Sequence, residues 1–402
     1  MMKTSWENVR ILLALSTAAI FLIYYISALP GYWNFTTLRL PDGLPIAPDF
    51  SNFWAASKLA LSGKPLLAYN ADYVSEIERQ FLGTQHPISA FYYPPIFLLI
   101  VLPLGLMSYL PALTIWLGVT LLLYILVLIK ISPHKLLIPF LVLFPGIYAN
   151  FVFGQNAFLS GFLLGAGLLL LDYSPLIAGC FLGFLCYKPQ FILLILIALL
   201  AGRYWKALIA TVATSILLSI ISAIVFGPEI WVAYFKIMSI PMSLLETGRV
   251  ALSIMPSFFA ATLSAGFNVK AAYLIQTIVM VMVLMGVVWV WWKKDTLALR
   301  GTILILGLLL FTPYAHIYEL AILALPLCWL WEDGPTNAVL LGEFLLLLCT
   351  WLMPFYIQFL WFHLDIFQGK LQIGPPVLLL FFLFTLIKSF IQPKRTLISD
   401  EV

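Results

Sequence analysis

Apolar runs long enough to cross a lipid bilayer recur along the whole chain of 402 residues. A membrane-spanning helix needs about 20 consecutive apolar residues, because each residue advances the helix by ~1.5 Å through ~30 Å of hydrocarbon. Hydrophobic residues make up 63% of the chain, charged residues only 9%, and the mean hydropathy is +1.05. A water-soluble domain does not have this composition. The sequence therefore predicts an all-α, polytopic transmembrane helical bundle that forms one integral membrane domain over residues 1–402.

We predict about twelve membrane segments and two long loops between them, at residues 30–90 and 228–269. The segments are expected at residues 11–29, 91–108, 110–130, 136–152, 156–172, 175–201, 205–227, 270–292, 297–314, 315–331, 336–361 and 373–392. The first segment is expected to be retained, because residues 1–10 lead into it without a small-residue cleavage site.

Lysine and arginine predict which side of the membrane each loop faces, since cytoplasmic loops carry an excess of positive charge. If successive segments alternate in direction, one group of positively charged residues lies on a single side of the membrane, which is then the cytoplasmic side. These residues are Lys3, Arg10, Arg203, Lys206, Lys293, Lys294, Arg300, Lys394 and Arg395. Both long loops then face outward. Lys130 and Lys135 do not fit this alternation, and a re-entrant pair of helices at residues 136–172 would explain them.

Charge and cysteine content argue against nucleic acid and metal as partners. The net charge of +4 is small and scattered, without the block of Lys and Arg that binds nucleic acid. The four cysteines lie inside apolar runs at spacings that fit no metal site, which is typical of buried free thiols. We therefore expect no cofactor, no metal and no nucleic acid, and a lipid bilayer around the chain.

The first candidate for chemistry is Asp49, in the motif PDFSNFW outside the first apolar segment. An acidic residue beside aromatic residues at the mouth of a helical bundle is a candidate general base. The alternative is an N-cap, whose carboxylate accepts backbone N–H bonds at the start of a helix over residues 50–62. A second helix is expected over residues 70–82, starting at Asn70 or Asp72. Both helices are expected to lie on the membrane surface.

Lys188 lies near the middle of the apolar run 175–201. A cation at that depth costs ~2.5–3.5 kcal/mol on insertion scales, so it should face a partner or a cavity. That partner is a buried phosphate, a structural carboxylate, or the carbonyls that Pro189 leaves without a donor.

Other polar residues interrupt apolar segments. His316 and Glu319 are three residues apart and share a face if they lie on a helix, either in a solvated loop or in an active-site wall. Tyr93 precedes two prolines at the end of a segment, where aromatic residues are normally interface anchors. Gln155 lies in a polar break that a plain turn also explains. Arg249, in the second loop, would meet an anionic group unless it is only solvated. The loop residues His86, His363 and Asp365 have no motif around them.

Taken in order, these motifs resemble glycosyltransferase family 87, within the GT-C class of membrane glycosyltransferases. The matching pieces are Asp49 with Phe53-Trp54-Ala55-Ala56, Leu61-Ser62-Gly63-Lys64-Pro65, Tyr69, Tyr93-Pro94-Pro95, Pro103-Leu104, Gly154-Gln155-Asn156, Gly179, Tyr187-Lys188-Pro189, Pro313 and Tyr318-Glu319-Leu320. The resemblance spans roughly residues 45–330. Where the family often has Tyr-Asp-Leu, this chain has a glutamate, whose carboxylate reaches further.

The resemblance implies transfer of a hexose, with mannose the best-known sugar, from a polyprenyl-phosphate sugar to a glycolipid or glycan acceptor. Transfer would invert the anomeric carbon at the outer face of the inner membrane. By the same resemblance Asp49 is the base and His316 lies near the donor phosphate. We expect Lys188 and Gln155 to line the donor cavity. The remaining substrate-binding residues are expected to be Tyr93, Glu319 and Arg249.

A single carboxylate suffices for this chemistry. Inverting transfer needs one base for the acceptor hydroxyl, placed opposite the leaving group. The leaving group is already a phosphate, so no second carboxylic acid is required, unlike in a typical glycosidase. Lys, Arg or His can balance a lipid monophosphate in place of a metal, because it carries less charge than a nucleotide diphosphate.

Two other functions stay open at this point. A lipid or lipid-linked-sugar flippase or transporter explains the many segments and Lys188. It also predicts an internal repeat, which the sequence does not show. A protein glycosyltransferase, or a polymerase-ligase of surface polysaccharide within the GT-C class, would differ in its acceptor and not in its chemistry.

Overall fold

The computed structural model of the chain describes residues 16–17, 19–26, 45–83, 91–132, 137–333, 340–363 and 372–391. These residues form α- and 3₁₀-helices joined by turns, with no β-strand among them. The predicted all-α fold is therefore confirmed for this part of the chain. His86, Lys135 and residues 11–15, 18 and 27–29 of the predicted segment 11–29 lie outside the described residues.

Four of the described helices are long and apolar enough to cross a membrane. They are α5 (Tyr109–Ile131), α11 (Trp205–Phe226), α15 (Val269–Lys293) and α19 (Gly374–Ile391). The 22 residues of α11 advance the helix by about 33 Å, enough for ~30 Å of hydrocarbon. These helices confirm the predicted segments 110–130, 205–227, 270–292 and 373–392.

Apart from the 24-residue α18, which has Pro354 inside it, the other apolar segments form shorter or interrupted helices, so the predicted total of about twelve segments is not confirmed. Their elements are α4 (Pro95–Val101), η2 (Leu102–Leu106), α6 (Leu137–Val142), α7 (Pro145–Phe153), α8 (Ala157–Leu170), α9 (Pro175–Gly183), η3 (Phe184–Tyr187), α10 (Pro189–Ala201), α16 (Leu297–Phe311), η5 (Ile317–Leu323), α17 (Ala324–Asp333) and α18 (Leu340–His363). Several of these helices begin at proline, whose missing N–H stops the preceding helix from continuing.

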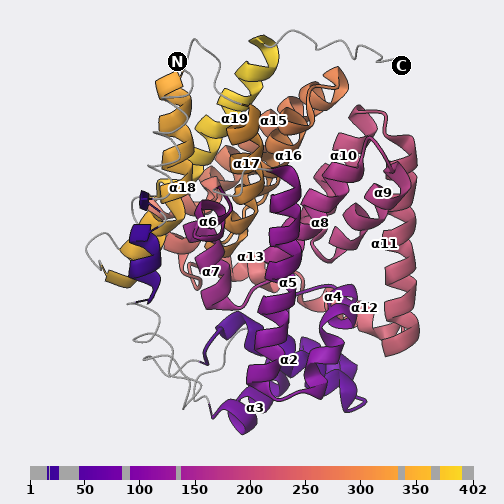
Figure 1. The fold of residues 1–402 in the computed structure, drawn as a ribbon. Coiled ribbons are helices and arrows are strands. Elements are labelled where there is room, and N and C mark those ends of the chain that lie inside the picture. The colour runs from indigo at the N-terminus through magenta and orange to yellow at the C-terminus, as the bar shows by residue number, and fades with distance from the viewer. Residues whose placement is uncertain are drawn as a thin grey trace.

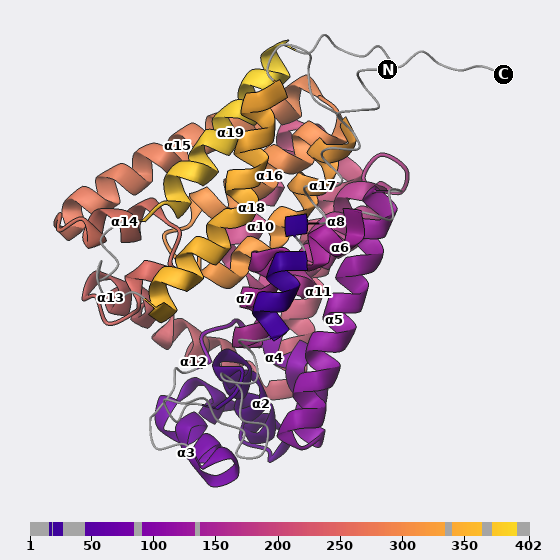
Figure 2. The ribbon, with the colours of Figure 1, turned by 60° about the vertical axis from the view of Figure 1, so that its left-hand side comes forward.

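Helices of the first predicted loop gather at one end of the molecule, the lower end in Figure 1 and Figure 2, which we call the α2 end, and α12 of the second loop lies near them. The first loop contains α2 (Pro48–Leu61), η1 (Pro65–Tyr69) and α3 (Ala71–Leu82), and the second contains α12 (Glu229–Ile237), α13 (Ile240–Glu246), η4 (Leu252–Ile254) and α14 (Phe258–Ser264). α3 begins as predicted, with Asn70 accepting the N–H of Asp72. α2 is not the predicted surface helix, because η1, η2, α3 and α5 pack around it and bury most of its residues.

The predicted segment 91–108 does not cross the bundle as one helix, which corrects the prediction. α4 and η2 together advance only about 20 Å. At the start of the segment, Tyr69 of η1 donates a hydrogen bond to the carbonyl of Tyr93 at 3.1 Å. At its end, Trp54 of α2 donates to the carbonyl of Met107 at 3.0 Å. The chain therefore enters and leaves this segment at the α2 end.

The predicted segment 175–201 is also not one helix. α9, η3 and α10 replace it, and the chain reverses direction at Lys188, directly before Pro189. After α10, Tyr204 donates from its hydroxyl to Asp172, which precedes α9, at 2.7 Å. Both ends of the segment therefore lie together, away from the α2 end, and the reversal at Lys188 lies inside the bundle (Figure 1).

The position of Lys130 removes the exception in the charge pattern. Because residues 91–108 fold back, α5 leaves the α2 end, and its 23 residues carry Lys130 to the opposite end. Arg300 lies at that opposite end, where it forms an ion pair with Asp172 at 2.6 Å. Residues 136–172 nevertheless form short helices that meet at a turn, as a re-entrant pair requires.

Candidate active site

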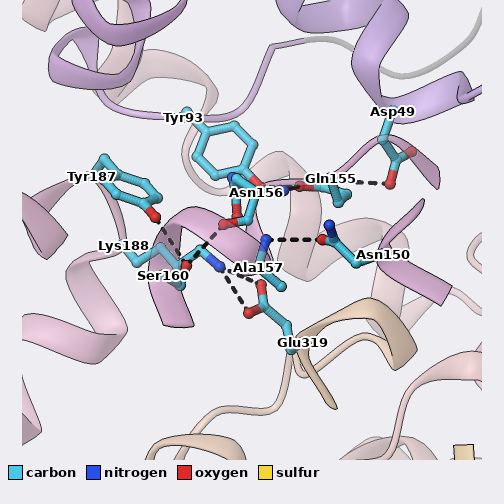
Figure 3. Close-up of polar contacts among 10 residues, drawn as sticks. All are labelled: Asp49, Tyr93, Asn150, Gln155, Asn156, Ala157, Ser160, Tyr187, Lys188 and Glu319. Atoms are coloured by element: carbon cyan, nitrogen blue, oxygen red, sulfur yellow. Dashed lines mark hydrogen bonds and ion pairs between the residues drawn. The ribbon is translucent and has the colours of Figure 1, made fainter. Parts of the chain in front are cut away.

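Polar side chains meet where several helices are interrupted (Figure 3). They come from the start of α2, from the residue pair before α4, from the turn between α7 and α8, from the break between η3 and α10, and from η5. The ten residues drawn are Asp49, Tyr93, Asn150, Gln155, Asn156, Ala157, Ser160, Tyr187, Lys188 and Glu319. Segments far apart in the sequence therefore build one polar centre in an apolar bundle.

Asp49 is the second residue of α2 and is partly exposed. The N-cap is Ala47, whose backbone is left-handed (φ 52°) and whose side chain makes no cap bond. The alternative reading of Asp49 as an N-cap is therefore wrong. Its Oδ2 instead accepts a hydrogen bond from Nε2 of Gln155 at 3.1 Å. The hydroxyl of Tyr109 lies 2.5 Å from the carbonyl of Ile46 and 3.1 Å from that of Ala47, and it fixes the backbone before the helix.

Gly154 allows the turn between α7 and α8 to reach the start of α2. Its φ is +69°, a region that residues with a Cβ rarely adopt. A Cβ there would lie 2.6 Å from Cβ of Phe50 and 2.7 Å from Cβ of Ala47. Glycine is thus required both for the positive φ and for the close contact of this turn with the start of α2. That contact brings the next residue, Gln155, to Asp49.

The orientation of the Gln155 amide follows from its partners. Its Oε1 accepts the backbone N–H of Asn156 at 3.0 Å and the hydroxyl of Tyr93 at 3.1 Å. A backbone N–H only donates, so the oxygen of the amide must face it and the nitrogen must face Asp49. Asp49 is therefore held in one rotamer by a donor that is itself fixed at its other end.

Burial raises the pKa of Asp49 from its ordinary value to about 6, and the hydrogen bond from Gln155 lowers it in part. A carboxylate with this pKa is mostly ionised at neutral pH and is a stronger base than an ordinary aspartate. This matches the requirement for a general base, whose pKa should lie near the working pH.

Lys188 and Glu319 form a buried ion pair. Nζ of Lys188 lies 2.6 Å and 2.7 Å from the two carboxylate oxygens of Glu319, and the residues are 1% and 7% exposed. The pair joins the break before α10 to η5. Of the partners expected for Lys188, the structure shows the carboxylate. Participation of either residue in donor binding stays a prediction.

His316 and Glu319 do not share a helical face, which corrects that expectation. His316 is the N-cap of η5 and has an extended backbone, so it precedes the helix. Its ring stacks on Tyr318, with centroids 5.1 Å apart and planes 8° apart, while Glu319 points to Lys188. Nδ1 of His316 is buried and has no hydrogen-bond partner among the described residues.

Arg249 lies apart from this centre. It follows α13, is exposed, and its side chain makes no hydrogen bond or ion pair within the described part of the chain. Its predicted role in binding an anion therefore stays a prediction. Within the same described residues, no group of three or more His, Cys, Asp and Glu side chains is arranged to hold a metal ion.

Four polar residues of the centre, Asn150, Asn156, Ser160 and Tyr187, were not singled out as site residues from the sequence. Asn150 accepts the backbone N–H of Ala157 at 2.9 Å, at the start of α8. Ser160 bonds the hydroxyl of Tyr187 at 2.9 Å. Asn156 is fully buried, and neither atom of its side-chain amide has a hydrogen-bond partner among the described residues. Their signal in the sequence was polarity inside apolar runs, which identifies interior positions but not their partners.

Two helices point their N-terminal ends at this centre. α8 begins directly after Asn156 and has 14 residues, and α10 begins directly after Lys188 and has 13 residues. The N-terminal end of a helix carries a partial positive charge and free N–H groups, both of which favour an anion. The N–H of Ala157 is already bound to Asn150 and Pro189 has no N–H, so these ends contribute mainly their partial positive charge, beside the amide of Asn156.

A family model described as Glycosyltransferase family 87 matches residues 91–313. The match covers more than half of the chain and includes Tyr93, Gln155 and Lys188, whereas Asp49 precedes it and His316 follows it. No curated protein and no solved structure matches the chain. With its long apolar helices, the protein is a membrane glycosyltransferase. The chain belongs to glycosyltransferase family 87.

Proposed function

We propose that this membrane glycosyltransferase transfers a hexose, with mannose as the first candidate, from a polyprenyl-phosphate sugar to a glycolipid or glycan acceptor. Transfer occurs with inversion on the extracytoplasmic side of the inner (plasma) membrane, at the α2 end. The observation that carries the proposal is Asp49, a partly exposed carboxylate with a pKa of about 6, held by Gln155 where the interrupted helices meet. Family membership favours this function over the flippase alternative.

Asp49 acts as the general base. The acceptor hydroxyl attacks the anomeric carbon of the sugar, and its proton passes to Asp49 as the new glycosidic bond forms. The bond between the anomeric carbon and the phosphate oxygen breaks on the opposite face, which inverts the configuration. Gln155 occupies one oxygen of the carboxylate, so the other oxygen is left to take the proton.

The phosphate of the donor lies, in this proposal, at the N-terminal ends of α8 and α10. The unpartnered amide of Asn156 gives a donor there, and Lys188 lies one residue before α10. Helix ends and side-chain amides stabilise the charge that the leaving phosphate develops. Lys188 already has Glu319 as a partner, so its net charge toward the phosphate is small.

A groove beside the centre supports a donor with a long apolar tail. It measures about 460 Å³ and is lined only by apolar side chains and Cys180, among them Ile100, Leu159 and Phe184. Leu159 directly precedes Ser160, and Phe184 begins η3, so the groove is lined by elements that also contribute to the polar centre. Phe184 and the neighbouring Ile177 are 39% and 54% exposed on the apolar surface of the bundle, where lipid surrounds them.

The first experiment compares sugar transfer by the wild type, Asp49→Asn and Asp72→Asn, with synthetic polyprenyl-phosphate sugars and purified protein in nanodiscs. Asp72 is an exposed aspartate in the first turn of α3, so it is a matched control. Loss of a general base lowers the rate by ~10²–10⁴-fold, so Asp49→Asn should be nearly inactive and Asp72→Asn fully active. The product should have the opposite anomeric configuration to the donor. Equal activity of wild type and Asp49→Asn would refute the assignment.

The groove is tested with Cys180→Trp and, as control, Cys349→Trp. Both cysteines are exposed on the apolar surface, on α9 and α18, but only Cys180 lines the groove. A tryptophan at position 180 should raise the KM for a long-chain donor and leave a short-chain donor unaffected. An equal effect on both donors would place the tail elsewhere.

A further inference from the structure

Glu78 of α3 is a fully buried carboxyl group outside the centre described above. The elements packed against α3 are α2 and η1, whose titratable groups are Asp49, Lys58 and Tyr69, and Tyr109 of α5 lies within electrostatic range. Lys58 lies over two aromatic rings, and both tyrosines donate to backbone carbonyls. Among the described residues, Glu78 therefore has no positively charged partner, and an ionised carboxylate without one is costly inside a protein.

The contacts of Ser51 favour a proton on Glu78. Oγ of Ser51 is 2.7 Å from the carbonyl of Pro48 and 2.5 Å from Oε1 of Glu78. A serine hydroxyl has one hydrogen, and a carbonyl or a carboxylate only accepts. If Glu78 were ionised, only one of these contacts would be a hydrogen bond. If Glu78 is protonated, it donates to Ser51, and Ser51 donates to Pro48.

We propose that Glu78 acts as a neutral, protonated carboxyl group and is a positioning residue, whose hydrogen bond through Ser51 to Pro48 fixes the turn that carries Asp49. Pro48 directly precedes Asp49, and Ser51 lies two residues after it, so the bonded chain encloses that residue. Together with Tyr109, whose hydroxyl contacts the carbonyls of Ile46 and Ala47, it fixes the start of α2 from two neighbouring helices. The effect on activity rests on the proposed role of Asp49, whereas the protonation does not.

Loss of this proton has a defined consequence. Burial raises the pKa of Glu78 from its ordinary value to about 7, and the contact with Ser51 lowers it in part. Below that pH the carboxyl group is neutral and both hydrogen bonds exist. Above it, a buried charge replaces the donor, and Ser51 can satisfy only one of its two acceptors. Activity should therefore fall as the pH rises beyond about 7.

Infrared spectroscopy tests the protonation directly. The wild type should show a carbonyl band of a protonated carboxyl group at pH 6 that is absent from Glu78→Gln and fades as the pH rises through about 7. The exposed Glu76, which pairs with Arg79 at 3.2 Å on the same helix, provides the control Glu76→Gln, which should keep the band. A difference spectrum without this band overturns the proposal. The readout requires no substrate, so it is independent of the proposed function.

The pH profile of transfer then tests the positioning role. The amide of Gln donates to Ser51 as a protonated carboxyl does, so Glu78→Gln should stay active and lose the decline at alkaline pH. Glu78→Leu, which removes the donor, should lose about 10- to 100-fold in activity, the effect of a displaced catalytic group. Glu76→Gln should keep the profile of the wild type. A Glu78→Gln protein with the wild-type alkaline decline, or as inactive as Glu78→Leu, overturns the positioning role.

Discussion

The buried pair of Lys188 and Glu319 gives the sharpest prediction about stability. Lys188→Met or Glu319→Leu removes one partner and leaves the other charge without compensation. Each residue is less than one-tenth exposed and both oxygens of Glu319 contact Nζ, so solvent replaces neither interaction. Breaking a buried pair in this way costs about 3–5 kcal/mol. Replacing both partners by apolar residues of similar size is often neutral or stabilising.

We therefore expect the wild type and the double variant to be equally stable, and both single variants to be far less stable. If the double variant matches the wild type, each single cost is cancelled, and the coupling energy between the two positions equals about 6–10 kcal/mol, the sum of the two costs. The measurement is unfolding of purified protein in detergent, followed by tryptophan fluorescence, for all four proteins. If the double variant is instead destabilised by the sum of the two single costs, the reasoning is refuted.

The same double variant separates structural from catalytic roles. If Lys188 serves only Glu319, the stable double variant keeps its transfer activity. If Lys188 also contacts the donor phosphate, the double variant folds but loses a charge-assisted hydrogen bond worth about 1.5–3 kcal/mol. That loss corresponds to a roughly 10- to 150-fold weaker interaction with donor. Donor titration of the double variant, compared with wild type, distinguishes the two outcomes.

Two further predictions concern the contact between the α7–α8 turn and α2. Gly154→Ala should lower the melting temperature and the activity together, because its Cβ would lie 2.7 Å from Ala47 at a φ of +69°; unchanged values would show that the turn adapts. Gln155→Leu removes the hydrogen bond that lowers the pKa of Asp49, so the rise of activity with pH should move above about 6. An unmoved or lower midpoint in the pH profile would contradict that reasoning.

The sequence predicted the long spans and the chemical character of the site, but not how interrupted segments fold. Residues 205–227 are continuous and apolar, so helix length alone determined their structure. Residues 175–201 are equally apolar, yet the chain reverses at Lys188, because Pro189 prevents continuation and Glu319 supplies a partner inside the bundle. That partner lies more than a hundred residues away, so no local pattern contains it.

Asp49 also shows the difference between what a sequence pattern predicts and what only the folded structure shows. Its motif identified a candidate base, but a first-turn aspartate after proline is equally typical of a helix cap. The structure distinguishes the two because Gly154 permits a close approach that brings Gln155 to the carboxylate. Likewise, the sequence predicted only a surface helix over residues 70–82, the helix that contains Glu78. Only the packing of α2 against α3 buries it and joins it to Ser51.

Interrupted helices explain how this chain holds a polar centre in an apolar bundle. Inside a membrane every backbone N–H and C=O must find a partner within the protein, so a continuous helix has no free group for a substrate. A break at Gly154 or before Pro189 interrupts the helix and places polar side chains inside the bundle. Contacts between distant segments help to stabilise these breaks: Gln155 meets Asp49, and Lys188 meets Glu319. The contacts that assemble the bundle are thus the same contacts that assemble its candidate active site.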